Sequence, residues 1–213
     1  MDENADDDEV ELIPQARQAS DYRMIDAWFD SLRDEPDSIE IDGIVKLSDA
    51  LGIDPENDPV ILVLAKYMDA KKMLHFSREE FRKGMTELGC DSTASLKAKL
   101  PQLRETLNNK RQFKELYLFL YSYALDAGQR ILTKDMAMGL WKLLFHDKFA
   151  LFPKWMEYFE KYHKHGVSKD MWSQFLAFTE LPGLAEGHYE AIDKIDAWPT
   201  LLDEFVAYLK STK

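Results

Sequence analysis

Two aspartates near the end of the chain have the residue type and the spacing that suit them to binding chemistry. Ser168 is a predicted helix N-cap, which places Asp170 in the first turn, and apolar residues recur at helical spacing over 172–179. Because Asp170 falls outside that apolar stripe, its carboxylate is expected to face water. Asp203 has the same relation to a helix that begins near Pro199. Two exposed carboxylates on an aromatic base suit a basic partner, although each acid taken alone is more simply explained as a complement to its helix dipole.

Side chains able to perform covalent or metal chemistry are few and poorly placed. The sequence contains no glycine-rich phosphate loop, no G-x-S-x-G or H-E-x-x-H motif, and no Cys/His spacing typical of zinc. Cys90 precedes Asp91, whose charge would raise the pKa of a thiol, so a structural thiol is favoured over a nucleophile. His163 and His165 diverge on a helix and are interpreted as surface residues. We therefore expect no catalytic centre and no cofactor, and a helical hydrolase using Cys90 is the weakest alternative.

Charge and composition narrow the class of partner. The chain of 213 residues has a net charge of −12, and residues 1–11 contain seven acids and no base. An acidic leader at 1–19 is expected to be disordered, and the overall sign disfavours nucleic acid while favouring a basic protein partner. Residues 142–169 form a local basic strip with six lysines against three acids, interpreted as a solvated face. A single cysteine and the lack of a membrane-length apolar run predict a soluble protein of the cytoplasm, the nucleus or both, with no membrane partner.

Helical periodicity dominates the chain and predicts an all-α fold. The expected helices lie at 23–32, 44–51, 60–68, 77–88, 95–107, 112–125, 133–145, 153–163, 168–179 and 199–209. A capping box at Ser77–Glu80 begins one of them and Gly89 ends it, whereas Pro101 is expected to interrupt another. After the leader, we expect two helical lobes, 20–110 and 111–213, that together form one domain.

A weaker repeat suggests how the helices pair. Helix, short loop, β-type residues and helix recur around 39–41, 74–76, 131–133 and 166–168, which is the outline of paired EF-hand units. In the best-matching loop, Asp69 and Glu80 take the first and last ligand positions. Lys71 stands where a ligand oxygen is needed, and Leu74 replaces the glycine of the turn. The N-terminal lobe is therefore predicted to be EF-hand-like without calcium ligands, and an EF-hand-like adaptor, calcium-responsive or not, is the main alternative function.

Several phrases of the sequence together resemble one known family. They are I-D-G-I at Ile41–Ile44, D-P-E-N at Asp54–Asn57, G-M-T-E-L-G-C-D-S at Gly84–Ser92, L-F-P-K-W at Leu151–Trp155, S-K-D-x-W from Ser168, and A-W-P-x-L-x-D-E-F from Ala197. In this order they resemble the defective-in-cullin-neddylation family, whose shared unit is called the potentiating-neddylation domain. The resemblance implies an all-helical domain of two lobes that acts as a scaffold-type co-ligase and has no active site of its own.

The resemblance also implies two binding sites. The family's acidic cullin-binding patch matches Asp170, Ala197 and Asp203, and it meets the basic winged-helix end of a cullin. A hydrophobic pocket accepts the acetylated N-terminal methionine of the neddylation conjugating enzyme. Its matching positions are Ile41, Ile44, Val60, Val63, Leu64, Tyr67, Phe76, Tyr123 and Leu143. From the residues alone, the aliphatic and aromatic excess over 60–76 and 113–145 fits either a core or a pocket where the lobes meet.

The mechanism that the resemblance implies is approximation. A scaffold that holds a cullin and the charged conjugating enzyme together raises the effective concentration of the acceptor lysine near the thioester. Such a scaffold needs no nucleophile. A RING protein supplies a further contact in the reaction of this family.

Overall fold

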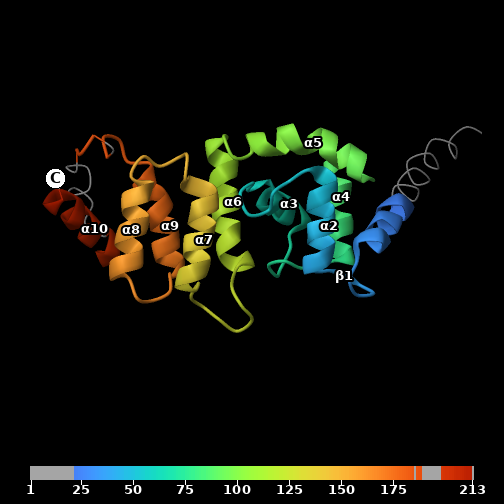
Figure 1. Cartoon of the computed structure of the whole chain (residues 1–213), viewed down its shortest axis with the longest axis horizontal. Helices are drawn as coiled ribbons and strands as arrows, with labels where there is room; N and C mark the ends of the chain where they lie inside the picture. The colour runs from blue at the N-terminus through green and yellow to red at the C-terminus, as the bar shows by residue number, and fades with distance from the viewer. Residues whose placement is uncertain (1–21, 185, 189–197, 213) are drawn as a thin grey trace, which may run out of the picture. The chain divides into compact units, whose positions relative to one another are not determined.

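The structure is a computed structural model that describes residues 22–184, 186–188 and 198–212. Helices dominate it, which confirms the predicted all-α fold (Figure 1). A helix at 22–32 is followed by α2 (Ile41–Leu51), α3 (Val60–Met68), α4 (Arg78–Leu88), α5 (Thr93–Glu105), α6 (Lys110–Tyr123), α7 (Lys134–Phe145), α8 (Phe152–Tyr162), α9 (Lys169–Thr179) and α10 (Thr200–Ser211). Two short strands, β1 (Ser38–Ile39) and β2 (Phe76–Ser77), pair antiparallel. Within these ranges, every helix is too short or too polar to span a membrane.

Local capping residues set the starts of several helices, as predicted. The side chain of Ser77 accepts a hydrogen bond from the backbone N–H of Glu80, and the Glu80 carboxylate accepts one from the backbone N–H of Ser77. The Ser168 hydroxyl likewise accepts from the backbone N–H of Met171 at the start of α9. Both predicted N-caps are therefore confirmed, and they define where the exposed first turns of α4 and α9 begin.

The predicted interruption of a helix near Pro101 is wrong. The helix α5 continues through the proline without a break. Pro101 is exposed, whereas Leu100 and Leu103 beside it are buried. Packing of this leucine face outweighs the one backbone hydrogen bond that the proline cannot donate.

The β-type residues of the repeat pair two by two. Ile39 lies opposite Phe76 in the β1–β2 ladder. Further along the chain, Leu132 and Val167 exchange backbone hydrogen bonds of 3.0 and 2.8 Å. Each pairing joins two successive helix–loop–helix segments, in the order that the repeat suggested. The EF-hand-like identity of the N-terminal lobe itself stays a prediction.

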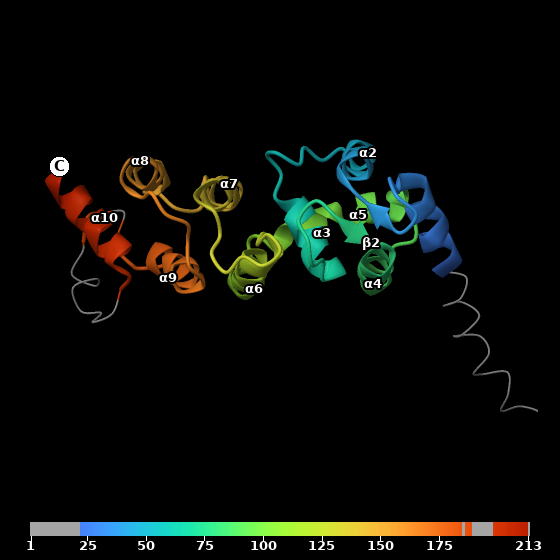
Figure 2. The ribbon, with the colours of Figure 1, turned by 90° about the horizontal axis from the view of Figure 1, so that it is seen from below.

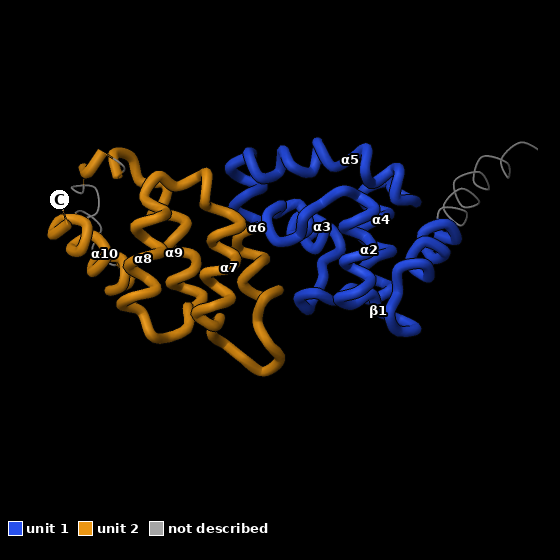
Figure 3. The backbone as a smooth tube through the Cα atoms, in the orientation of Figure 1, with its two compact units in different colours: residues 1–116 blue, residues 117–213 orange. Residues whose placement is uncertain are grey.

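The chain forms two compact units, residues 1–116 and 117–213, which Figure 3 draws in separate colours. The change from one unit to the other falls inside α6, so this helix supplies residues to both. The acidic leader expected at 1–19 lies outside the described residues.

The centre of unit 1 is α3, which is apolar around most of its circumference. Val63 and Met68 are fully buried, and α3 packs against both α4 and α5. A Cβ atom on Gly84 of α4 would stand 2.5 Å from Cγ and 2.9 Å from Cα of Met68. The absence of a side chain at Gly84 therefore permits the close approach of α4 to α3.

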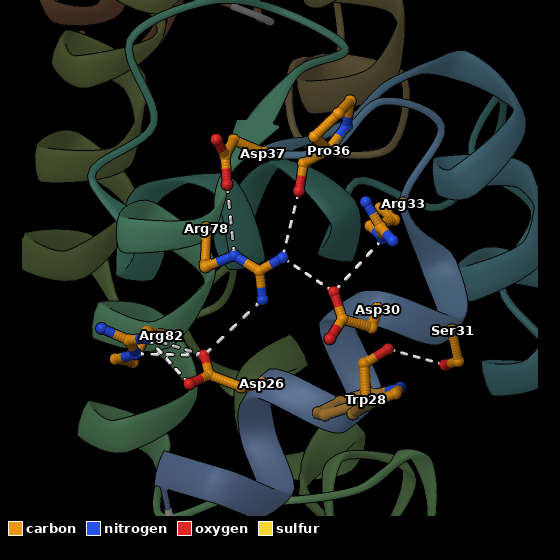
Figure 4. A network of polar contacts seen from close by, with 9 residues as sticks. All are labelled: Asp26, Trp28, Asp30, Ser31, Arg33, Pro36, Asp37, Arg78 and Arg82. Carbon is orange, nitrogen blue, oxygen red and sulfur yellow. Dashed lines mark hydrogen bonds and ion pairs between the residues drawn. The ribbon is translucent and has the colours of Figure 1, made fainter.

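Arg78, at the start of α4, is the centre of a polar network in unit 1 (Figure 4). Its guanidinium donates to the Asp30 carboxylate at 2.7 Å and to the carbonyl oxygen of Pro36 at 3.0 Å. The hydrogen bond from Arg78 lowers the pKa of the Asp30 carboxyl group. One turn further, Arg82 donates to both carboxylate oxygens of Asp26 at 2.8 Å. These contacts fasten the helix at 22–32 to α4.

Aromatic side chains fill the core of unit 2. Figure 2 looks along α7, α8 and α9, and it shows α9 on one side of the layer formed by α7 and α8. Trp172 of α9 stacks on Tyr117 with ring centroids 4.3 Å apart and on Trp141 of α7 at 5.6 Å. Phe175, one turn further along α9, lies 4.6 Å from Trp155 of α8. This packing holds α9, and with it the first turn that contains Asp170.

Candidate functional site

Asp170 lies in the first turn of α9, and its side chain is exposed, as predicted from its place outside the apolar stripe. The residues that follow it, Met171 and Trp172, are buried. Trp172 is also fixed by polar contacts, because its indole N–H donates to the carbonyl oxygen of Tyr117 at 2.8 Å and its own carbonyl accepts from the Tyr117 hydroxyl at 2.9 Å. The Asp170 carboxylate therefore projects from a helix with a firmly held base.

Asp203 has the same surroundings at the start of α10. It lies in the first turn with an exposed side chain, while Leu202 and Phe205 on either side are fully buried. The ring of Phe205 lies 5.1 Å from that of Trp155 of α8. Among the described residues, neither Asp203 nor Asp170 has an ion-pair partner. Both carboxylates are thus available to a partner molecule.

The helices that carry the two aspartates meet through aromatic side chains. Phe178 is the ring of α9 that approaches Phe205 of α10, with centroids 6.0 Å apart. Phe178 lies about two helical turns, or about 12 Å, along α9 from Asp170. The end of α9 that carries Asp170 is therefore not the end that contacts Phe205 of α10. Ala197, the third predicted patch residue, lies outside the described residues.

The predicted pocket residues divide between the two units and between core and surface. In unit 1, five are buried: Ile44, Val60, Val63, Leu64 and Phe76. Tyr67 of the same unit is half-buried, and Ile41 is exposed. In unit 2, Tyr123 is buried and Leu143 is half-buried. Their assignment to a pocket stays a prediction, and Ile41 is the member most accessible to a ligand.

Two open hollows occur elsewhere on the described surface. One, of about 440 Å³, is lined by Tyr22, Glu79, Arg82, Lys83, Thr86 and Glu87. The other, of about 350 Å³, is lined by Lys134, Asp135, Met138, Gly139, Lys142 and Glu160. Both walls mix charges of both signs, and neither hollow includes a residue of the predicted patch or pocket.

Three apolar side chains near the end of the β1–β2 ladder are exposed, and the sequence analysis foresaw them only in part. Ile41 is 61% exposed, Val45 is 47% exposed and Leu74 is 50% exposed. We call these three residues the ladder-end patch. Ile41 and Val45 are one turn apart on α2 and share a face. Ile41 follows β1 closely and Leu74 precedes β2 closely, so both stand at the same end of the ladder.

Leu74 is also unusual in its backbone. Its φ of 55° lies in the left-handed region, which residues with a Cβ atom rarely adopt. The sequence held the signal, since leucine occupies the glycine position of the loop, but it was interpreted only as evidence against calcium. A strained backbone that presents an apolar side chain to water is unfavourable for stability, and this combination makes Leu74 a candidate for a binding role.

The carboxylates at the two ends of the segment between α3 and α4, those of Asp69 and Glu80, are bound by other groups of the protein. Asp69 accepts from the ammonium groups of Lys71 at 2.8 Å and Lys83 at 3.0 Å, and the hydrogen bond from Lys71, then that from Lys83, lowers the pKa of Asp69. The Glu80 carboxylate accepts from the backbone N–H of Lys71 at 2.8 Å and that of Ser77 at 2.7 Å. Throughout the described ranges, no group of three or more His, Cys, Asp and Glu side chains is placed to hold a metal ion.

The lone cysteine has the surroundings of a structural thiol. Cys90 is buried, and burial raises the pKa of its thiol, which disfavours the thiolate that a nucleophile requires. Its sulfur lies 3.6 Å from the carbonyl oxygen of Leu88. The geometry therefore offers no support for the hydrolase alternative.

Comparison with known proteins shows the family of the chain. Residues 95–208 match the family model described as "Cullin binding". DCN1-like protein 4 of Drosophila melanogaster is 38% identical over 186 residues, which cover 86% of this chain and 73% of that protein. DCN1-like protein 4 of Homo sapiens is 36% identical over 183 residues, 86% of this chain and 61% of that protein. DCN1-like protein 5 of Mus musculus is 35% identical over 184 residues, 86% of this chain and 76% of that protein. As its sequence motifs predicted, the chain belongs to the cullin-binding family of DCN1-like proteins.

Proposed function

We propose that this protein is a scaffold-type co-ligase for cullin neddylation. One observation carries the proposal: exposed aspartates in the first turns of α9 and α10 stand on a common aromatic core, in a chain of the cullin-binding family. The proposed partner is the basic winged-helix end of a cullin, because complementary charge favours both encounter and register.

The cullin contact is tested by removing both carboxylates. The variant Asp170→Ala with Asp203→Ala is compared with the variant Asp126→Ala with Asp135→Ala, which removes two exposed acids from the same unit. Asp135 also lies in the first turn of a helix, so the control matches the net charge and, at one of its two positions, the helix-dipole contribution. We expect about tenfold weaker binding of a cullin C-terminal domain by the first variant, equivalent to about 1.4 kcal/mol, and unchanged binding by the control. Equal binding by wild type and both variants would show that the acidic patch is wrongly assigned.

The second proposed contact is the acetylated N-terminal methionine of the neddylation conjugating enzyme. The accessible apolar residues of unit 1, Ile41, Val45 and Leu74, support it because a methionine side chain gains free energy by burial on such a surface. An acetylated terminus needs only a hydrogen bond for its amide, whereas a free ammonium group is strongly disfavoured by desolvation. The buried residues that flank the patch, such as Ile44 and Phe76, would then complete the site.

Calorimetry with two synthetic peptides tests this contact. The peptides share the N-terminal sequence of the conjugating enzyme and differ only in acetylation. The acetylated peptide should bind at least about tenfold more tightly. Similar affinities of the two peptides would exclude recognition of the acetyl group.

Within this proposal the protein itself makes and breaks no bond. It holds the cullin lysine and the conjugating-enzyme thioester together and thereby raises their effective concentration. A RING protein supplies the remaining contact. In a reconstituted transfer assay, the double aspartate variant should lose stimulation at limiting concentration and regain it as the cullin concentration is raised, because only binding has been weakened.

A further inference from the structure

The segment that leads into α9 carries a cluster of positive groups. Residues 161–169, which we call the basic turn, contain Lys161, Lys164 and Lys169, two histidines and no acid, in a chain whose net charge is −12. The side chains of all three lysines are exposed. A local concentration of positive charge on an otherwise acidic protein makes this segment a candidate contact for negatively charged groups.

Lys164 and Lys169 of the basic turn lack the carboxylate partners that several cations of unit 1 have. In unit 1, Lys66 pairs with Glu115 at 3.1 Å and Arg104 pairs with Asp58 at 2.5 Å, in addition to the pairs made by Lys71, Lys83, Arg78 and Arg82. Neither Lys164 nor Lys169 forms an ion pair with any carboxylate that the structure describes. These two ammonium groups are therefore directed to solvent.

The backbone of the basic turn is nevertheless firmly placed. Val167 is hydrogen-bonded to Leu132 in both directions. A Cβ atom on Gly166 would stand 2.4 Å from the carbonyl oxygen of Leu132, so glycine is needed for this close approach. The ring of His163 stacks on Phe159 with centroids 4.7 Å apart. The lysines are thus presented from a preorganised segment, which reduces the ordering entropy lost when a partner binds.

The basic turn ends next to the proposed cullin contact, because Lys169 directly precedes Asp170. The exposed charge therefore changes sign from one residue to the next, from Lys169 to Asp170. A polyphosphate backbone would be repelled by the Asp170 carboxylate, whereas a protein surface can present both signs at matching positions. We propose that the basic turn contacts Asp and Glu side chains that lie beside the basic face of the same cullin, and that it selects among cullins by this match. The inference rests on the proposed function.

A charge-reversal variant tests this proposal, because the two explanations predict opposite changes in cullin affinity. The variant Lys164→Glu with Lys169→Glu makes the surface beside Asp170 more negative. If the basic turn is a bystander, this change should strengthen binding of a basic partner by long-range attraction. If it contacts acids, binding of the cullin C-terminal domain should weaken by about tenfold, and the loss should shrink as salt is added. The control Lys97→Glu with Lys114→Glu makes the same charge change at exposed positions of unit 1 and should leave affinity within about twofold of wild type.

The outcomes separate this inference from the function on which it rests. Lost binding in the aspartate variant with unchanged or tighter binding in the lysine variant would overturn the basic-turn contact alone. No binding by the wild-type protein would overturn both. A single-stranded RNA retained by wild type and released by the lysine variant would assign the turn to nucleic acid instead. If replacing one acidic residue of the cullin with lysine restores binding of the lysine variant, that acidic residue is the contacted side chain, and the proposal is supported.

Discussion

We expect the Leu74→Gly variant to be more stable than the Leu74→Ala variant. In the interior of helices and strands, the glycine variant is the less stable of the two. Leu74 has a φ of 55°. A left-handed backbone costs a residue with a Cβ atom about 1–2 kcal/mol, whereas glycine loses about 0.5–1 kcal/mol more conformational free energy on folding than alanine does. The difference predicts that Leu74→Gly exceeds Leu74→Ala in free energy of unfolding by about 0.5–1 kcal/mol. Both variants lose the same side-chain contacts beyond Cβ, so the comparison isolates the backbone.

The same pair of variants separates stability from recognition. Leu74 is 50% exposed, and the exposed half is available to a bound peptide. Because full burial of a leucine contributes about 1.5–3 kcal/mol, burial of half contributes about 1 kcal/mol, or about fivefold in affinity for the acetylated peptide. Both variants should therefore bind the peptide about fivefold more weakly than wild type, although glycine restores stability relative to alanine.

Two measurements check this reasoning. Urea unfolding followed by circular dichroism gives the midpoints of the two variants, and an unchanged slope shows that the unfolded state is comparable. Calorimetry gives the peptide affinities. If the alanine variant is at least as stable as the glycine variant, the backbone at 74 is not strained. If both variants bind the acetylated peptide as wild type does, Leu74 is not part of the recognition surface.

Three further predictions concern stability. Tyr117→Phe leaves the buried indole N–H of Trp141, which donates to the Tyr117 hydroxyl at 3.0 Å, without its partner, and denaturant unfolding should show a loss of about 2–3 kcal/mol. Gly84→Ala places a methyl group against the backbone of α3, and a thermal melt should show a loss of about 1–3 kcal/mol. Asp69 has its pKa lowered below 3.8 by the hydrogen bond from Lys71, so its stabilisation is complete above pH 3.8 and is lost as the pH falls through the lower folded-state value. Acid unfolding of Asp69→Asn should accordingly show a shallower decline in that range than wild type.

The sequence was sufficient where structure depends on neighbours along the chain. The capping box at Ser77 and the cap at Ser168 involve residues within one turn, and periodicity alone placed Asp170 and Asp203 on the exposed sides of their helices. Pro101 shows where such reasoning fails, because the packing of distant elements on the leucine face of α5 overrides the local preference of proline.

The apolar positions of unit 1 were less predictable for a related reason. Aliphatic residues in a core and in a ligand site have the same types and the same spacing, so only tertiary burial separates Ile44 from Ile41. Val45 and Leu74 were not identified because exposure of an apolar side chain leaves no periodic signal. The positive φ of Leu74 is likewise a property of the folded loop, which the substitution of glycine by leucine only hints at.

If the protein acts only by holding two partners together, its two contacts are expected to act independently of each other. The ladder-end patch belongs to unit 1, whereas Asp170, Asp203 and the basic turn belong to unit 2. Aspartate or lysine variants should therefore alter cullin affinity without changing peptide affinity, and Leu74 variants should do the reverse. In the transfer reaction the two losses should add in free energy, because each weakens one of two linked binding steps. Strong non-additivity would mean that the surfaces are coupled through the fold, and that holding two partners together is an incomplete account of the activity.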